Sequence, residues 1–187
     1  MNKDKKEIFK LALMLHDIGK MKTQSNENGK IRYIGHDKIG ADIAEKRLKD
    51  LNFSNEDIKY AKNLILYHMK IHDLLYKNNK TKIKDAAKLF ITLQEDLPFI
   101  KDIIEFSSYD DKPENGSKYK DLELLFENFS KKPKIITGKD VMEFPENIRN
   151  KLILQMRYLQ LVHNYNETEL RKYLKSEAHN ILKHKVD

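Results

Sequence analysis

Residues 16 to 20 carry side chains suited to metal chemistry. They read His16-Asp17-Ile18-Gly19-Lys20 and follow an apolar run from Phe9 to Leu15. A neutral imidazole beside a carboxylate is a pair of metal ligands. Lys20 lies one helical turn past the histidine and suits an anionic substrate, because its ammonium group attracts negative charge. Few structural needs require this combination, so the segment predicts a metal site that acts on an anion.

The motif resembles the core motif of the HD superfamily of metal-dependent phosphohydrolases. Later segments are similar, in the same order, to the C-terminal half of bacterial tRNA nucleotidyltransferases, the CCA-adding and poly(A)-polymerase-like enzymes. That half carries an HD domain and a helical tail. The similarity is specific from Leu11 to Met69 and looser beyond. The segments are Gly35-His36-Asp37-Lys38-Ile39-Gly40-Ala41, Leu51-Asn52-Phe53-Ser54-Asn55-Glu56, Tyr67-His68-Met69 and Ile136-Thr137-Gly138-Lys139-Asp140-Val141-Met142.

The resemblance implies a divalent metal ion (Mn, Ni, Co, Mg or Zn) with His16 and Asp17 among its ligands. The HD pattern adds an aspartate from a later helix, and we expect Asp110 in that place, with Asp111 as the second choice. A solvated loop residue is the alternative interpretation of Asp110. The pattern also adds a histidine from an earlier helix, but residues 1–15 contain none. We therefore expect the chain to start after that helix and to bind metal weakly, with a metal-free site as the alternative.

Two further histidines match positions that bind a second metal or the substrate phosphate in some HD phosphohydrolases. His36 precedes a predicted helix, and His68 shares an apolar stripe with Ile58 and Ile65, so it should face inward. A hydrogen-bonded core histidine is the alternative for His68. His72 is one turn later, and we expect it at the surface rather than in the site.

Lys20 and Asp17 are the expected catalytic residues. The resemblance places Lys20 near the substrate, where its ammonium would neutralise a phosphoryl oxygen as charge develops in the transition state. The alternative for Lys20 is an exposed lysine on a lysine-rich chain. Substrates would be phosphoesters or nucleotides, including cyclic or terminal phosphates of RNA.

The apolar periodicity predicts an all-α fold, an HD helical bundle followed by a small helical tail. We divide the chain into an HD domain at 1–117 and a tail at 118–187. Ser54 is the expected N-cap of a helix that ends near Met69. Polar loops are expected at 21–33, with an Asn28-Gly29 turn, and at 110–117. Gly40 should mark close packing between helices. Other helices are expected at 5–16, 37–51, 82–94, 98–107, 147–162 and 168–182.

The composition of the chain excludes some classes of function and favours others. The net charge is +7, which favours polyanions such as RNA, although a lysine-rich composition alone would also produce it. The chain has no cysteine, which excludes disulfides and thiolate metal sites and is compatible with a cytoplasmic location. No segment is apolar for long enough to cross a bilayer, so no membrane is expected as a partner.

The tail leads to a competing hypothesis. In the resembled enzymes this region holds the tRNA acceptor arm, and Lys139, Arg149 and Arg157 are the weak candidates for RNA contact here. The sequence shows no Gly-Ser motif with paired aspartates on strands, as a nucleotidyltransferase head requires. The chain is therefore either a phosphohydrolase or a non-catalytic tRNA-binding module that works with a separate nucleotidyltransferase head.

Overall fold

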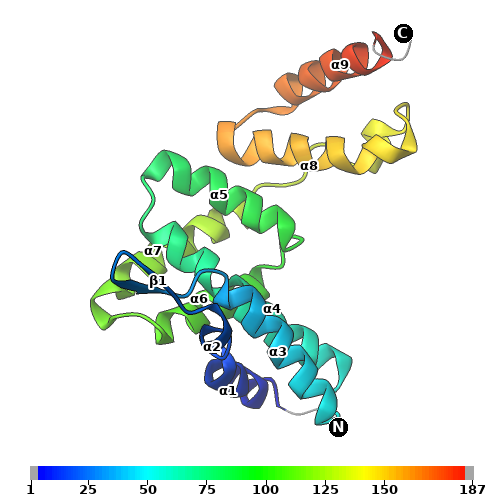
Figure 1. Cartoon of the computed structure of the whole chain (residues 1–187). Helices are drawn as coiled ribbons and strands as arrows, with labels where there is room; N and C mark the ends of the chain where they lie inside the picture. The colour runs from blue at the N-terminus through cyan, green and yellow to red at the C-terminus, as the bar shows by residue number, and fades with distance from the viewer. Residues whose placement is uncertain (1–3, 184–187) are drawn as a thin grey trace. The chain divides into compact units, whose positions relative to one another are not determined.

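The computed structural model describes the backbone of residues 4–183 and the side chains of residues 4–177. It confirms the predicted all-α fold (Figure 1). The elements are α1 (Lys5–Leu15), α2 (Lys20–Thr23), β1 (Ser25–Glu27), β2 (Lys30–Arg32), α3 (His36–Asp50), α4 (Asn55–Leu75), α5 (Asn79–Thr92), α6 (Leu97–Tyr109), η1 (Pro113–Asn115), α7 (Gly116–Ser130), η2 (Gly138–Val141), α8 (Glu146–His163) and α9 (Glu167–Lys183).

Two predicted loops contain secondary structure that the sequence analysis missed. Within 21–33, β1 and β2 form an antiparallel hairpin in which Ser25 pairs with Arg32. Its turn residues Asn28 and Gly29 both have positive φ, as a tight hairpin turn requires. The strands are only three residues long each, too short for an alternating pattern to stand out. Within 110–117, the polar stretch gives way at Gly116 to α7.

The chain forms two compact units, which are described separately. One unit contains 1–76 and 101–122, and the other contains 77–100 and 123–187. Helices α6 and α7 contribute residues to both units. Residues 77–100, which were expected in the HD domain at 1–117, thus belong to the second unit.

In the first unit, α4 packs against both α1 and α3. Ser54 caps α4 as predicted, because its side chain accepts a hydrogen bond from the backbone N–H of Asp57. Helix α4 presents one apolar face along its length. The fully buried residues of this face include Ala61, Leu64, Ile65 and Ile71, so α4 is the central helix of the unit and a rigid support for the polar residues on it.

In the second unit, a small core forms where η2 and α9 pack against α8. A buried ion pair joins α8 to the end of α5, since the Arg157 guanidinium lies 2.9 Å from the Glu95 carboxylate. The buried core residues are Ile136, Val141, Phe144, Leu152, Met156, Leu170 and Leu174. None of the described helices combines the length and the apolar character needed to cross a membrane.

Candidate metal centre

His16 and Asp17 lie in the short connection between α1 and α2, and this connection is pressed against α3. A Cβ atom built on Gly19 would lie 2.1 Å from the carbonyl oxygen of His36 and 2.6 Å from the backbone nitrogen of Gly40. Only glycine fits at such a distance. Gly40 makes the reciprocal approach to the backbone of His16 and Gly19, which confirms the close packing expected at Gly40. The two glycines thus fix His16 and Asp17 beside the N-terminus of α3.

His68 and His72 both project from α4. This helix continues to Leu75, so its predicted end near Met69 is wrong. Residues four apart share a helix face, and His72 therefore lies on the same inward face as His68. The His68 side chain is fully buried, as predicted. The expected surface position of His72 is wrong, because only 14% of its side chain is exposed.

Asp110 follows the last residue of α6 and brings a carboxylate to the end of α1. Its Oδ1 atom lies 3.2 Å from His16 Nε2, and Asp17 Oδ1 lies 3.5 Å from the same nitrogen. The expected convergence of these three residues is therefore found in the structure. Their ligand atoms form a group of suitable size to hold a metal ion.

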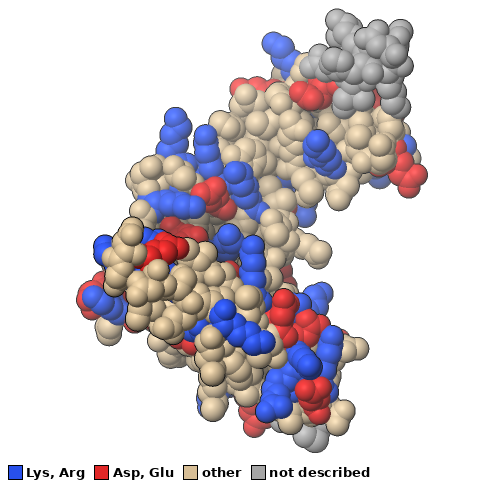
Figure 2. Space-filling model, in the orientation of Figure 1, with Lys and Arg blue, Asp and Glu red and all other residues tan. Residues whose placement is uncertain are grey.

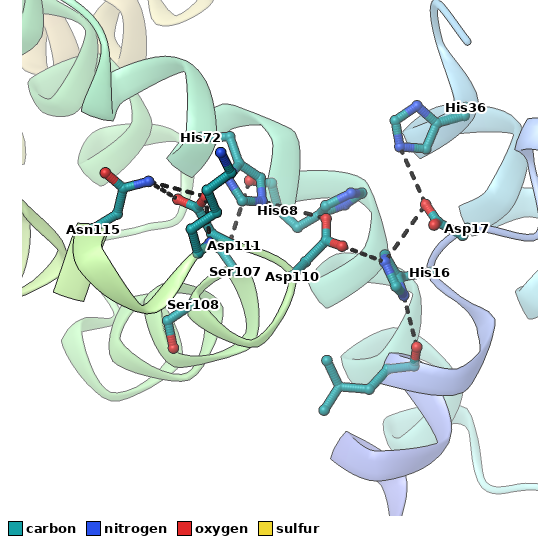
Figure 3. Close-up of polar contacts among 12 residues, drawn as sticks. His16, Asp17, His36, His68, His72, Ser107, Ser108, Asp110, Asp111 and Asn115 are labelled. Atoms are coloured by element: carbon teal, nitrogen blue, oxygen red, sulfur yellow. Dashed lines mark hydrogen bonds and ion pairs between the residues drawn. The ribbon is translucent and has the colours of Figure 1, made fainter.

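The convergence extends to a row of five residues (Figure 3). His36 Nε2 lies 3.8 Å from Asp17 Oδ1 at one end of the row. His72 Nε2 lies 3.5 Å from Asp110 Oδ2 at the other end. His16 stands in the middle, between the two carboxylates. We name the row His36, Asp17, His16, Asp110 and His72 the His–Asp row.

Each of three histidines at the site bonds a backbone carbonyl three residues earlier through its Nδ1 atom. The Nδ1–O distances are 2.7 Å for His16, 2.8 Å for His36 and 2.6 Å for His68. A carbonyl oxygen only accepts, so Nδ1 carries the proton in each neutral ring. Nε2 is then left with a free lone pair, the form in which histidine binds metals.

Several buried polar atoms at the site lack a hydrogen-bond partner within the described residues: His16 Nε2, Asp17 Oδ1, His68 Nε2 and His72 Nε2. Since Nε2 of the neutral His16 ring carries no proton, its contact of 3.2 Å with Asp110 Oδ1 is not a hydrogen bond. An unpaired buried polar atom normally costs about 1–3 kcal/mol. Donor atoms of this kind, gathered in one place, fit a divalent cation with nitrogen and oxygen ligands.

The electrostatics of the row follow from the same contacts. Asp110 beside the ring raises the pKa of His16 above its ordinary value. His16 and His72 hold the pKa of the Asp110 carboxyl well below its usual range. Burial lowers the pKa of His68 to about 4, so its ring is neutral near pH 7. The site therefore presents an ionised carboxylate and a neutral buried imidazole, both of which suit metal binding.

Lys20 contacts Asp17 from the side opposite the histidines. Its Nζ atom lies 2.6 Å from Asp17 Oδ2, while Oδ1 faces the row. Lys20 also lines a groove with a volume of about 590 Å³ that reaches His36. The groove carries three further basic residues and an aromatic ring, namely Arg32, Lys38, Lys70 and Tyr33, and it also carries two carboxylates, Asp37 and Asp73, so that basic side chains are in excess. An anion in this groove would meet positive charge next to the His–Asp row.

The residues expected to contact RNA lie in the second unit. Lys139 is exposed at η2, and Arg149 is half-buried because it donates to the carbonyls of Phe144 and Met142. Arg157 is buried, and its guanidinium is bonded to Glu95 and to nearby acceptors. This burial leaves Arg157 a structural role, and we do not retain it as an RNA contact.

Comparison with known proteins identifies the domain that carries this site. Residues 1–93 match the family model for the HD domain. The N-terminal half of the chain is an HD domain. HD domains are generally metal-dependent, in keeping with the donor atoms of His16 and Asp17. Asp110 lies beyond the matched residues, and the fold brings it back to them.

Two curated proteins are similar to the chain. The CC-adding tRNA nucleotidyltransferase of Thermus thermophilus is 29% identical over 141 residues, which cover 71% of this chain and 30% of that protein. The A-adding tRNA nucleotidyltransferase of Deinococcus radiodurans is 33% identical over 64 residues, 33% of this chain and 15% of that protein. The similarity thus spans less than a third of either relative's length. No solved structure matches the chain significantly.

Proposed function

We propose that the chain is a metal-dependent phosphohydrolase of the HD superfamily. The observation that carries the proposal is the meeting of His16, Asp17 and Asp110, in which His16 Nε2 and Asp17 Oδ1 are buried and have no hydrogen-bond partner among the described residues. These three residues would hold the ion, and His36 and His68 would hold a second ion or the substrate phosphate. A bound divalent ion supplies charge neutralisation at a phosphoryl oxygen and a more acidic water.

Lys20 and Asp17 are the proposed catalytic residues. Asp17 directs Oδ1 to the histidines, while its Oδ2 is held by Lys20. Lys20 thereby fixes the orientation of the carboxylate and faces the groove at the same time. Its ammonium group would stabilise the negative charge that develops on a phosphoryl oxygen in the transition state.

The groove supports a substrate that is longer than a bare phosphate. Arg32, Lys38 and Lys70 provide positive charge along it, and Tyr33 offers an aromatic face on which a base can stack. We therefore propose a nucleotide, or a terminal or 2′,3′-cyclic phosphate of RNA, as the substrate. The proposal places the enzyme in the cytoplasm, where such compounds occur.

A panel of phosphoesters tests this function. We expect hydrolysis of at least one nucleotide, cyclic phosphate or RNA-terminal phosphate in the presence of Mn²⁺, Co²⁺ or Ni²⁺, and none with a chelator. Asp110→Asn should abolish the activity, with Asp121→Asn as a control carboxylate outside the site. Absence of hydrolysis across the whole panel by a protein that has bound metal would reject the enzymatic proposal.

A second candidate is a tRNA-binding module that works with a separate nucleotidyltransferase head. The names of the two relatives and the net charge of +7 favour it. In this version, 118–187 would be the tRNA-binding region and the HD domain at 1–117 would be a scaffold. Tight binding of tRNA together with an absence of hydrolysis would favour this candidate over the first.

A further inference from the structure

The ring of His72 directs its Nε2 atom toward Asp110 Oδ2. Its Nε2 atom lies 3.5 Å from Asp110 Oδ2 and has no hydrogen-bond partner within the described part of the chain. Two ligand atoms that each lie about 2.1 Å from one ion at a tetrahedral angle are about 3.4 Å apart. The spacing therefore suits a shared cation.

The other nitrogen of the ring is fixed by Tyr119 on α7. The Tyr119 hydroxyl lies 3.2 Å from His72 Nδ1, 2.9 Å from Asp111 Oδ2 and 3.1 Å from the Ser107 carbonyl. The carboxylate and the carbonyl only accept, and the hydroxyl has one proton, which goes to one of them. The hydroxyl consequently faces His72 with a lone pair, so Nδ1 carries the proton and Nε2 does not.

Asp111 is itself held in place. Asn115 Nδ2 lies 3.0 Å from each Asp111 carboxylate oxygen. A chain of contacts therefore runs from the Asn115 amide through the Asp111 carboxylate and the Tyr119 hydroxyl to the His72 ring. A carboxylate that acts on a ligand histidine in this way fixes the tautomer and increases the basicity of the opposite nitrogen. This arrangement prepares His72 as a ligand, which a purely structural histidine does not need.

We propose that His72 Nε2 and Asp110 Oδ2 form a second cation position that shares Asp110 with the position at His16 and Asp17. This proposal rests on the metal site of the proposed function, and it leaves His36 and His68 the second of their two proposed roles, the binding of the substrate phosphate. Asp110 can serve both positions, because its Oδ1 lies near His16 Nε2 and its Oδ2 lies near His72 Nε2. His72 and Asp110 would hold the second ion, which would supply further charge neutralisation for an anionic substrate.

Metal stoichiometry measured with Mn²⁺ on the full chain tests the second position. By titration calorimetry and electron paramagnetic resonance, we expect the wild type to bind two Mn²⁺ ions whose spectra show coupling between close neighbours. His72→Gln should bind one ion without coupling, with that ion's affinity changed less than about threefold. His163→Gln, an exposed histidine in the second unit, should behave like the wild type.

Tyr119→Phe gives an independent measurement, because it removes the hydroxyl beside His72 Nδ1, together with that hydroxyl's contacts to Asp111 and Ser107, and leaves His72 itself unchanged. The weaker of the two Mn²⁺ sites should lose about tenfold in affinity, as is typical when the partner of a ligand is removed, and circular dichroism should confirm an intact fold. Two coupled ions in His72→Gln, or one ion in the wild type, would overturn the second position and leave the proposed function standing. No Mn²⁺ bound by the wild type would overturn both.

Discussion

The histidine side chains are oriented for metal binding by contacts to the backbone of their own helix or turn. His16, His36 and His68 each use Nδ1 on a carbonyl three residues earlier. The proton is thereby confined to the side away from the site, and the Nε2 lone pair is available without any rearrangement. For His72, the Tyr119 hydroxyl takes the place of the backbone carbonyl as the partner of Nδ1. The orientation of the first three rings is therefore a local property of the chain, whereas that of His72 depends on Tyr119 from a distant helix.

Replacing Lys20 separates charge stabilisation from metal ligation. We expect Lys20→Met to lower kcat for a chromogenic phosphodiester by about 100-fold, since one positioned donor at a developing negative charge contributes about that much. Metal affinity should fall much less, because Lys20 contacts Asp17 Oδ2 but is not itself a ligand. The kcat is measured at saturating Mn²⁺, and the metal affinity is measured by titration with Mn²⁺.

Lys20→Arg is the matched control, since it keeps the charge next to Asp17 and should recover part of the activity. If Lys20→Met had the wild-type kcat, Lys20 would have no role in the transition state. If it lost metal affinity and activity in equal proportion, its role would be limited to positioning Asp17.

The residue types of the site were largely predictable, and its partners were not. His16, Asp17 and Asp110 were expected from the motif and from the end of a predicted helix, and the structure brings them together. His72 was assigned to the surface because its helix was predicted to end too early. Its spacing of four from His68 was the available signal. Tyr119 was missed because residues 118–187 were assigned to the helical tail, so Tyr119 on α7 was not placed near the site.

At the level of helices and turns, the approach of Gly19 to α3 holds the motif in place. Gly19→Ala should destabilise the protein by about 2–3 kcal/mol, because a Cβ atom would overlap the His36 carbonyl oxygen. Chemical denaturation measures the change. Gly116→Ala is the control, since a Cβ atom there meets nothing within 4 Å, and it should change the free energy of unfolding by less than about 0.5 kcal/mol. Equal stability of the two variants would contradict the close packing.

An ion-pair cluster joins α3 to α4 and gives a pH-dependent contribution to stability. Lys49 and Lys62 lower the pKa of Glu45 from 4.5 to about 2. A carboxyl whose pKa is lower in the folded state stabilises it above pH 4.5, and this contribution is lost as the pH falls toward 2. Since the cluster is partly exposed, we expect Glu45→Gln to cost about 0.5–1 kcal/mol at pH 7.

The difference between wild type and Glu45→Gln in the free energy of unfolding should shrink steadily between pH 4.5 and the lowest pH at which the protein stays folded. Urea denaturation at several pH values measures it. Glu114→Gln is the control, since it makes the same change in net charge at an exposed site. Its effect on the free energy of unfolding is subtracted from that of Glu45→Gln. A difference that stayed constant or grew as the pH fell would contradict the ion-pair account.

The start of a helix was predicted well where a cap was clear, whereas the end of α4 was placed too early. Ser54 marks the start of α4 because its hydroxyl satisfies a free backbone N–H. The division into units was harder to foresee. The contacts that place α5 with α8, such as the pair of Arg157 with Glu95, join residues far apart in sequence. Local patterns carry no information about such pairs.

For the molecule as a whole, the net charge of +7 and the similarity to two tRNA nucleotidyltransferases make tRNA a proposed partner. On the face shown in Figure 2, Lys and Arg side chains lie over helices of both units, with acidic side chains among them. We expect the full chain to bind tRNA at low salt, with a log–log salt slope of about −0.7 to −0.9 per phosphate contacted. Filter binding across a salt series measures the slope.

Charge reversal locates the RNA contact. Lys139→Glu should weaken tRNA binding several-fold and make the salt slope shallower by about one contact. Lys46→Glu makes the same change in net charge on α3 of the first unit and should have a much smaller effect, because the tail is the proposed contact region. Equal effects of the two variants would mean that binding follows net charge alone.

The central claim is that His16, Asp17 and Asp110 hold a divalent metal ion, and titration calorimetry of the full chain with Mn²⁺, Co²⁺, Ni²⁺ and Zn²⁺ tests it most directly. We predict saturable binding of at least one of these ions. Asp17→Ala should weaken it by more than the 10–100-fold loss typical of removing a ligand's partner, whereas Asp42→Ala, a carboxylate on α3 whose side chain is 74% exposed, should bind like the wild type. If none of the four ions binds the wild type, or if Asp17→Ala binds with unchanged affinity, the metal centre does not exist as described.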